Sequence, residues 1–266
     1  MCPEELKEGC SQLWDNQPKE MLTNLQYRIL KRISSGPTTN YSGSAYQGKS
    51  KLDLLLGSEF INKIVGKTVI DFGCGEGIEA VEMALKGAKR VIGIDIREDL
   101  LQRARQKAIT AGVQNLCIFT SSTEEHGEIV VSIDAFEHFA DPAAILRIMN
   151  TLLLPAGEVL VSFGPTWYHP RGGHTFSVFP WSHLIFSEKA LMRWRSTFKT
   201  DGATRFSEVT GGLNQMTAKR FEELIDNSTL KVAALELVPI RKLKAFHNRF
   251  TREFTTAIVR CQLVKR

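Results

Sequence analysis

From Lys67 onward, apolar segments of two kinds alternate along the chain. Short apolar runs such as KTVIDFG (67–73) and RVIGIDI (90–96) are bounded by turn residues, which is typical of buried strands. The segment between them, GIEAVEMALKG (77–87), carries apolar residues at helical spacing and ends in glycine, which is typical of an amphipathic helix. Such alternation predicts an α/β fold with a parallel sheet, helices on both of its faces, and ligands at the carboxyl ends of its strands.

The alternation of strands and helices continues to a fifth strand and then stops. Further elements are expected at 97–112 (helix), 115–120 and 128–134 (strands), 142–154 (helix, capped by Asp141), 157–163 (strand), 217–226 (helix), and 231–238 and 252–264 (strands). Between the fifth strand and residue 217 lies a long aromatic and histidine-rich segment. A long irregular insert at the carboxyl end of a strand predicts a functional lid.

These patterns predict the domain organisation. Residues 1–66 are expected to form an N-terminal helical cap, with one helix around KEMLTNLQYRILKRI (19–33). Residues 67–266 are expected to form the main domain, in which residues 163–200 are the inserted substrate lid.

The segment VIDFGCGEG (69–77) indicates a ligand loop. Gly73, Gly75 and Gly77 stand between a strand and a helix, and Asp95 ends the next strand about 20 residues further on. In the pattern for NAD or FAD, G-x-G-x-x-G/A, the last small residue lets helix and strand pack closely, but that position is Ile78 here. The loop therefore departs from the dinucleotide pattern.

The charges around this loop also argue against a phosphate. A pyrophosphate would sit at the N-terminus of the following helix, where the chain places Glu76, with Asp71 just before the turn. Two carboxylates repel a phosphate and suit a ligand that carries an ammonium and a sulfonium, with ribose hydroxyls for Asp95. A second phosphate-loop candidate, GSAYQGKS (43–50), matches G-x-x-x-x-G-K-[ST] but follows no apolar strand, so we expect no nucleotide there.

Four motifs, VIDFGCGEG, VIGIDI, SIDAFEH and LLPAGEVLVSFG, stand in this order and spacing. Together they resemble the class I S-adenosylmethionine-dependent methyltransferases, in their small-molecule, methyltransferase type 11-like branch. The resemblance covers about Val69 to Gly164 and, more weakly, the chain from NQMTAKRFEELI to its end. It implies a doubly wound, Rossmann-like, mostly parallel seven-stranded sheet and S-adenosylmethionine as the cofactor.

The same resemblance implies the cofactor-binding residues. The glycine loop approaches the methionine part of the cofactor, and Asp95 corresponds to the ribose ligand. Many members have an aspartate after the third strand that contacts the adenine amine, whereas this chain has TSSTEE, so a serine or threonine takes that place. The implied set is Asp71, Gly73, Gly75, Gly77, Asp95, Ile96, Ser122, Thr123 and Asp134.

Three histidines are candidates for a general base. If the acceptor is a hydroxyl, its proton must leave, and a neutral imidazole with a pKa of about 6.5 suits that task. His138 stands where the family often has Glu-His facing the active site, and His174 and His183 lie in the expected lid, where Gly172 and Gly173 allow turns that aim His174 inward. A structural role for each is the alternative. No HxxxH or HExxH pair accompanies them, so no metal is expected.

Composition and charge bear on where the protein works and on which partners it has. The chain is 43% hydrophobic and 24% charged, has no long apolar run and no signal-peptide pattern, and its five cysteines form no CxxC pair. We expect a cytoplasmic protein with no membrane partner. From Arg241 onward, eight Lys or Arg residues face one acid, Glu253, which indicates either a solvated basic face or a docking face for an anionic partner or RNA.

The sequence therefore predicts a methyltransferase that acts on a small, partly aromatic or apolar acceptor, at oxygen, by direct displacement. Methylation of nitrogen or sulfur, RNA methylation, and a non-catalytic S-adenosylmethionine-binding regulator are the alternatives. RNA is not the expected partner, because neither an NPPY-like signature nor a Pro-Cys pair follows the fourth strand. The oligomeric state is not predicted.

Overall fold

The structure is a computed structural model that describes residues 4–34, 36 and 50–266. Of the phosphate-loop-like segment 43–50, only Ser50 lies among these residues, and its hydroxyl caps a short helix by accepting a hydrogen bond from the Asp53 N–H. The chain forms two compact units. The sheet unit comprises 43–169 and 214–266, and the helical unit comprises 1–42 and 170–213.

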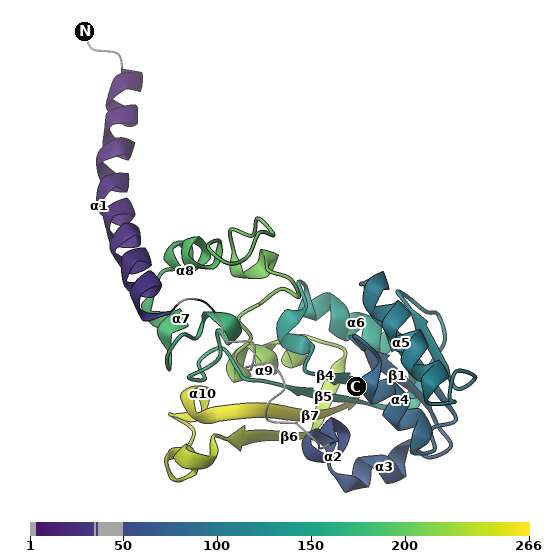
Figure 1. Cartoon of the computed structure of the whole chain (residues 1–266). Coiled ribbons are helices and arrows are strands. Elements are labelled where there is room, and N and C mark those ends of the chain that lie inside the picture. The colour runs from purple at the N-terminus through teal and green to yellow at the C-terminus, as the bar shows by residue number, and fades with distance from the viewer. Residues whose placement is uncertain (1–3, 35, 37–49) are drawn as a thin grey trace. The chain divides into compact units, whose positions relative to one another are not determined.

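The sheet unit is built on seven strands in the order β3-β2-β1-β4-β5-β7-β6 (Figure 1). All neighbouring strands are parallel except β7, which runs antiparallel to both β5 and β6. The strands are β1 (Thr68–Phe72), β2 (Arg90–Ile94), β3 (Cys117–Thr120), β4 (Gly127–Ile133), β5 (Leu153–Phe163), β6 (Leu230–Pro239) and β7 (Thr256–Lys265). The predicted doubly wound, mostly parallel seven-stranded sheet is confirmed.

Two hydrophobic clusters fill the space between the sheet and its helices. One cluster joins the sheet to α2 (Lys51–Leu56), α3 (Ser58–Ile64), α4 (Ile78–Leu85) and α5 (Glu98–Thr110). The other joins it to α6 (Pro142–Leu152) and α9 (Ala218–Asp226), and the short α10 (Arg252–Thr255) precedes β7. Strand side chains alternate between the faces, since Val69 belongs to the first cluster and Ile70 to the second.

The division between the units differs from the predicted one at residue 66. Leu52, Leu55, Phe60 and Ile64 are almost fully buried in the cluster that lies on the sheet. Burial of these four large side chains accounts for the inclusion of α2 and α3 in the sheet unit. The sequence had assigned α2 and α3 to the N-terminal cap of residues 1–66.

The helical unit is held together by α1 and α8. Its elements are α1 (Glu4–Ile33), η3 (His174–Phe176), α7 (Ser182–Ile185), α8 (Glu188–Arg195) and η4 (Phe206–Glu208). The Ser187 hydroxyl donates to the Gln26 side-chain oxygen at 2.7 Å, and the Trp194 indole N–H donates to the carbonyl of Ser34 at 3.2 Å. The N-terminal helix thus pairs with the end of the insert.

The insert leaves and rejoins the sheet unit at one place. Just before it, the Trp167 N–H donates to the carbonyl of Met216 at 2.8 Å. Just after it, the Asn214 N–H donates to the carbonyl of Glu137 at 3.0 Å. The inserted residues of the helical unit are 170–213, whereas the sequence predicted a lid over 163–200, of which Phe163 still belongs to β5.

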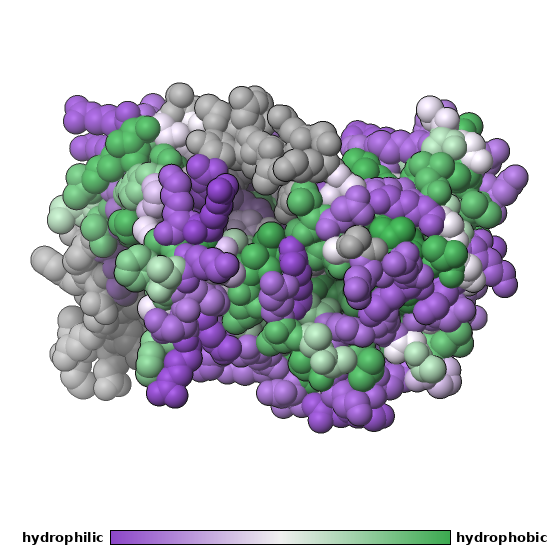
Figure 2. All heavy atoms as spheres, turned by 90° about the horizontal axis from the view of Figure 1, so that it is seen from below, coloured by the Kyte–Doolittle hydropathy of each residue, from purple (hydrophilic) through white to green (hydrophobic). Residues whose placement is uncertain are grey.

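Hydrophobic and hydrophilic residues are interleaved on the face seen in Figure 2. In the described part of the chain, none of the helices combines the length and the apolar character that a membrane span requires.

Candidate active site

The loop between β1 and α4 has a backbone that glycine favours. Gly73, Gly75 and Gly77 have φ angles of +84°, +52° and +71°, in the region that L-residues rarely adopt. The N–H groups of Gly73 and Cys74 both donate to the carbonyl of Ile94, at 2.8 and 3.0 Å, so the loop is fixed to the end of β2. The loop therefore has a fixed conformation rather than a flexible one.

The three glycines have different roles. A Cβ on Gly73 would lie 2.6 Å from the Cβ of Ala135, and one on Gly77 would lie 2.6 Å from the Cβ of Ala104. These two glycines are required for close packing. A Cβ on Gly75 would meet no atom within 4 Å, so the backbone there borders open space. Gly75 is the point at which a ligand can approach the loop.

Asp95, at the end of β2, orders this loop. It is 8% exposed; its Oδ2 accepts the Gly75 N–H at 2.9 Å, and its Oδ1 accepts the Arg97 N–H at 2.9 Å. The Arg97 Nε also donates to Oδ1, at 3.4 Å. A carboxylate has about four lone-pair sites, so these three contacts leave capacity for a ribose hydroxyl. Ile96, which follows, is 91% exposed.

Asp71 lies buried at the end of β1. It is 2% exposed, and its Oδ2 has no hydrogen-bond partner in the described part of the chain. Burial holds the pKa of Asp71 well above its usual value, repulsion from Glu79 and Asp95 adds to this, and Lys51 opposes it. A buried acid held in this way interacts favourably with a cation brought to the loop.

The sequence suggested that the Glu76 carboxylate faces a cationic ligand, but its charge is already paired within the protein. Its carboxylate pairs with Arg103 at 2.9 Å and with Lys107 at 2.6 Å, both on α5. Hydrogen bonds from these two residues lower the pKa of Glu76. Because two cations already match its charge, Glu76 is a weaker candidate for a cationic ligand than the buried Asp71. Glu79, whose charge acts on Asp71, is a further acid near the loop, and the sequence reasoning missed it.

Asp134 follows β4 with a φ of +49°, unusual for a residue other than glycine. Burial raises the pKa of Asp134, and the nearby charges of Lys51 and His138 lower it. The Lys51 ammonium lies 3.0 Å from Asp134 Oδ2 and 3.7 Å from Glu79 Oε1. Lys51 lies outside the four motifs, so no pattern in the sequence marked it.

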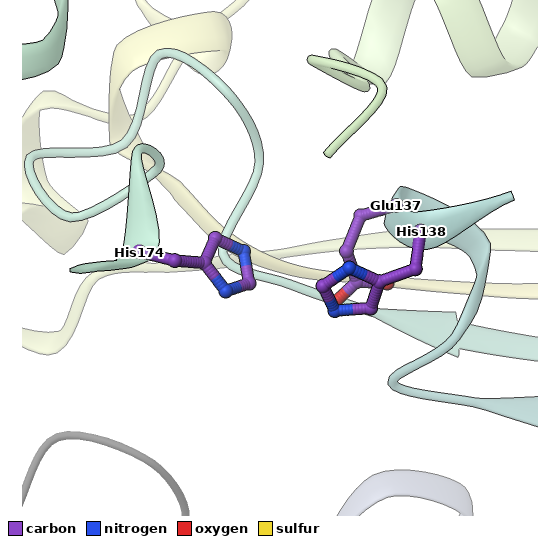
Figure 3. A group of neighbouring side chains, drawn as sticks. All are labelled: Glu137, His138 and His174. Atoms are coloured by element: carbon purple, nitrogen blue, oxygen red, sulfur yellow. The ribbon is translucent and has the colours of Figure 1, made fainter. Parts of the chain in front are cut away.

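Glu137 and His138 share the short helix η2 (Phe136–His138) after β4, as Figure 3 shows. A side-chain nitrogen of His138 lies within 4.8 Å of a carboxylate oxygen of Glu137. Glu137 is 2% exposed, and burial, with repulsion from Asp134, raises its pKa to about 8. Glu137 was also missed, although the motif SIDAFEH contains it. Two groups that can exchange protons thus stand at the end of β4.

The helical unit holds the other two histidines. His174 begins η3 with a φ of +50° (Figure 3), and its N–H donates to the carbonyl of Arg171 at 3.0 Å. His183 is 3% exposed, and its Nδ1 lies 3.1 Å from the Ser177 hydroxyl. A Cβ on Gly173 would lie 2.3 Å from the Cβ of His183, so a glycine at 173 is what allows His183 to pack there. The φ of Gly173 is −75°, so this glycine does not form the left-handed turn that the sequence suggested. This geometry favours a structural role for His183.

The predicted adenine-side residues lie in the turn after β3. The Thr120 hydroxyl donates to the Ser122 carbonyl at 2.9 Å, and the Thr123 hydroxyl accepts the Glu125 N–H at 3.1 Å. Ser122 is exposed and Thr123 half-buried. Their contact with a cofactor stays a prediction.

Residues 44–232, more than half of the chain, match the family model described as "Methyltransferase domain". The chain belongs to this methyltransferase family. A ubiquinone biosynthesis O-methyltransferase of Sodalis glossinidius is 40% identical over 119 residues, which are 42% of this chain and 46% of that protein. The chain thus spans about half the length of the curated relatives it matches.

Solved structures share the fold of this methyltransferase-family chain. Magnesium protoporphyrin IX methyltransferase of Synechocystis PCC 6803, solved with bound SAH, is 15% identical, with a TM-score of 0.54 and coverage of 91% of this chain and 93% of that one. An S-adenosylmethionine-dependent methyltransferase of Mesorhizobium loti is 17% identical, with a TM-score of 0.53 and coverage of 81% and 100%.

These findings confirm the predicted fold, family and enzyme class, with S-adenosylmethionine as the cofactor of that class. The residues of the loop fit this group. Gly75 borders open space, and the buried Asp71 presents a carboxylate oxygen without a partner in the described chain. A sulfonium and an ammonium satisfy such acids, whereas a pyrophosphate does not.

Proposed function

We propose that this protein transfers a methyl group from S-adenosylmethionine to the oxygen of a small molecule by direct displacement. The observation that carries the proposal is the pair Glu137 and His138, which stands next to Asp134 at the end of β4. Ligands of open α/β sheets collect at the carboxyl ends of the strands. An acid–base pair at this edge supports a site at which an acceptor meets the cofactor.

The protein's part in such a reaction is mainly to position the reactants and accept a proton. Asp95 is the residue for the ribose, and Asp71, Glu79 and Asp134 attract the positive charge of the cofactor, which supplies an electrophilic methyl group when bound. Holding the reactants in line can contribute about 7 to 11 kcal/mol to lowering the barrier. His138 accepts the proton that the acceptor hydroxyl loses, and the Glu137 carboxyl lies beside it to share the charge.

A phenolic hydroxyl is the acceptor that suits this site best. A phenol has a pKa of about 10, against about 16 for water, so an imidazole can remove its proton far more readily. The curated relative of Sodalis glossinidius is named for ubiquinone biosynthesis and for O-methylation, which supports an aromatic hydroxyl as the acceptor. Amines and thiols have less need of a base, so the presence of the pair favours oxygen.

The proposal is tested by screening acceptors with the purified protein. S-adenosylmethionine is supplied with simple catechols, aromatic amines or thiols, and formation of S-adenosylhomocysteine is measured. We expect turnover with catechols. His138→Ala should lower kcat by about 10²- to 10⁴-fold and leave cofactor affinity unchanged, because the ring acts on the acceptor.

The exposed His126 offers a matched control, and His126→Ala should keep full activity. Cofactor binding without turnover on any acceptor would favour the non-catalytic regulator. Turnover with amines or thiols alone would refute O-methylation.

A further inference from the structure

The connection between β6 and β7 exposes an unusual group of side chains. We call residues 241–254 the β6–β7 tip; they include η5 (Arg241–Phe246) and most of α10, and they join the two yellow strands in Figure 1. Phe246 is 66% exposed, Phe250 79% and Phe254 48%. The Phe254 ring also packs against that of Tyr168, with ring centroids 5.1 Å apart. Single exposed apolar residues are ordinary, but three partly exposed phenylalanines on one connection are an unusual concentration.

The tip is also strongly basic. Four exposed cations accompany the phenylalanines, and none of them forms an ion pair with an acid of the described chain: Arg241, Lys242, Lys244 and Arg249. The single acid of the segment is Glu253, whose Oε1 accepts the Lys219 N–H at 2.9 Å. Its charge is therefore oriented toward α9, and the tip carries a net positive field.

The phenylalanines are exposed on a structured loop. The Asn248 side-chain oxygen accepts the N–H groups of Phe250 at 2.9 Å and Thr251 at 3.3 Å. The Thr251 hydroxyl donates to the carbonyl of Phe246, and the His247 Nδ1 lies 2.8 Å from the hydroxyl of Thr255, the last residue of α10. A backbone held in this way fixes the positions from which the Phe246 and Phe250 side chains are exposed.

We propose that the β6–β7 tip docks the protein onto an anionic lipid surface. Aromatic side chains that enter the interface next to Lys and Arg side chains that contact anionic headgroups are the two contributions that give peripheral binding. Each is weak alone, and the tip combines them. The sequence predicted no membrane partner; the tip replaces this expectation with surface attachment and requires no spanning helix.

RNA is the other anionic partner that basic residues attract. Recognition of unpaired bases relies on stacking against an open aromatic face. The Arg249 guanidinium lies 4.4 Å from the centroid of the Phe250 ring and covers one of its faces. The most exposed ring of the tip therefore offers less stacking surface, while its edge remains free to enter lipid. This geometry favours the membrane.

Vesicle sedimentation tests the proposal. The full-length protein is mixed with vesicles of phosphatidylcholine alone or of phosphatidylcholine with phosphatidylglycerol, at low and at high salt. We expect binding to the anionic vesicles only, weakened by salt. The double variant Phe246→Ser/Phe250→Ser and the double variant Lys242→Glu/Lys244→Glu should each lower the bound fraction by about tenfold.

The control is Leu85→Ser/Ile109→Ser, two apolar residues of α4 and α5 that are 61% and 55% exposed. It should bind vesicles as the parent protein does. Cofactor binding by calorimetry shows that each variant is folded, and it separates this proposal from the proposed methyl transfer. Vesicle binding that survives both tip variants, or binding of a uridine oligonucleotide through the tip without any binding of vesicles, overturns the proposal.

Discussion

The carboxylates at the end of β2 and at the end of β4 are held in opposite ways. At β2, Asp95 accepts two backbone N–H groups and fixes the glycine loop. At β4, Asp134 is half-buried and Glu137 is buried, and burial raises the pKa of each. The β2 end is thus a preformed surface held by backbone hydrogen bonds, whereas the β4 end holds a carboxyl group, that of Glu137, whose protonation changes near pH 8.

The largest expected effect tests the rigidity of the glycine loop that Asp95 fixes. Gly77→Ala should destabilise the protein by about 2 to 5 kcal/mol, because the added Cβ meets Ala104 at 2.6 Å and Phe119 at 2.7 Å in a left-handed backbone. Gly112 has the same φ of +71° and open space around it, so Gly112→Ala should cost only about 1 to 2 kcal/mol. Urea unfolding of both variants measures the difference, and equal losses would contradict the packing role of Gly77.

The next effect separates binding by hydrogen bonds from binding by charge. Asp95→Ala should weaken S-adenosylmethionine and S-adenosylhomocysteine alike, by about 10- to 100-fold, because both share the ribose and the same loop. Asp134→Asn should weaken the sulfonium-bearing S-adenosylmethionine more than S-adenosylhomocysteine, because only the former carries the extra positive charge. Calorimetric titration gives the affinity ratios, and an equal loss of both ligands in Asp134→Asn would remove its charge role.

A third effect concerns the dependence of stability on pH at the β4 edge. The pKa of Glu137 rises from 4.5 to about 8 on folding, so between these values the folded state holds a proton that the unfolded state has lost. This contribution to stability is therefore complete below pH 4.5 and declines by about 1.4 kcal/mol per pH unit toward pH 8.

The test is to compare parent protein and Glu137→Gln by thermal unfolding across this pH range. The melting temperature of the parent should fall relative to that of the variant as pH rises, because glutamine has no proton to lose. Parallel curves would show that Glu137 titrates in the ordinary range.

The smallest effect is expected at Glu76. Its carboxylate is matched by Arg103 and Lys107, so Glu76→Gln should change cofactor affinity by less than about twofold. Glu79→Gln is the contrasting variant, because Glu79 belongs to the acid cluster beside Asp71. A loss in Glu76→Gln as large as that in Glu79→Gln would mean that Glu76 turns toward the ligand.

Local patterns predicted the sheet unit well. The strand around Val69 and the helix capped by Asp141 follow from short-range periodicity and capping, which the structure retains. The glycine loop was recognisable because its residues are contiguous and positive φ angles favour glycine.

What the sequence did not reveal depends on contacts between distant residues. Nothing near Glu76 shows that Arg103 and Lys107 lie opposite it, and nothing near Lys51 shows that it reaches Asp134, more than eighty residues later. Likewise, the burial that raises the pKa of Glu137 comes from the folded core and not from its neighbours in sequence. Residue type identified the candidates, and packing decided their roles.

The hydrogen bond between Trp167 and Met216 closes the base of the insert. Because the chain departs and returns at this clamp, residues 170–213 can change together with the α1 residues that contact them without altering a strand. The segment is therefore a natural place for exchange between family members, and such an exchange leaves the glycine loop and Asp95 unchanged.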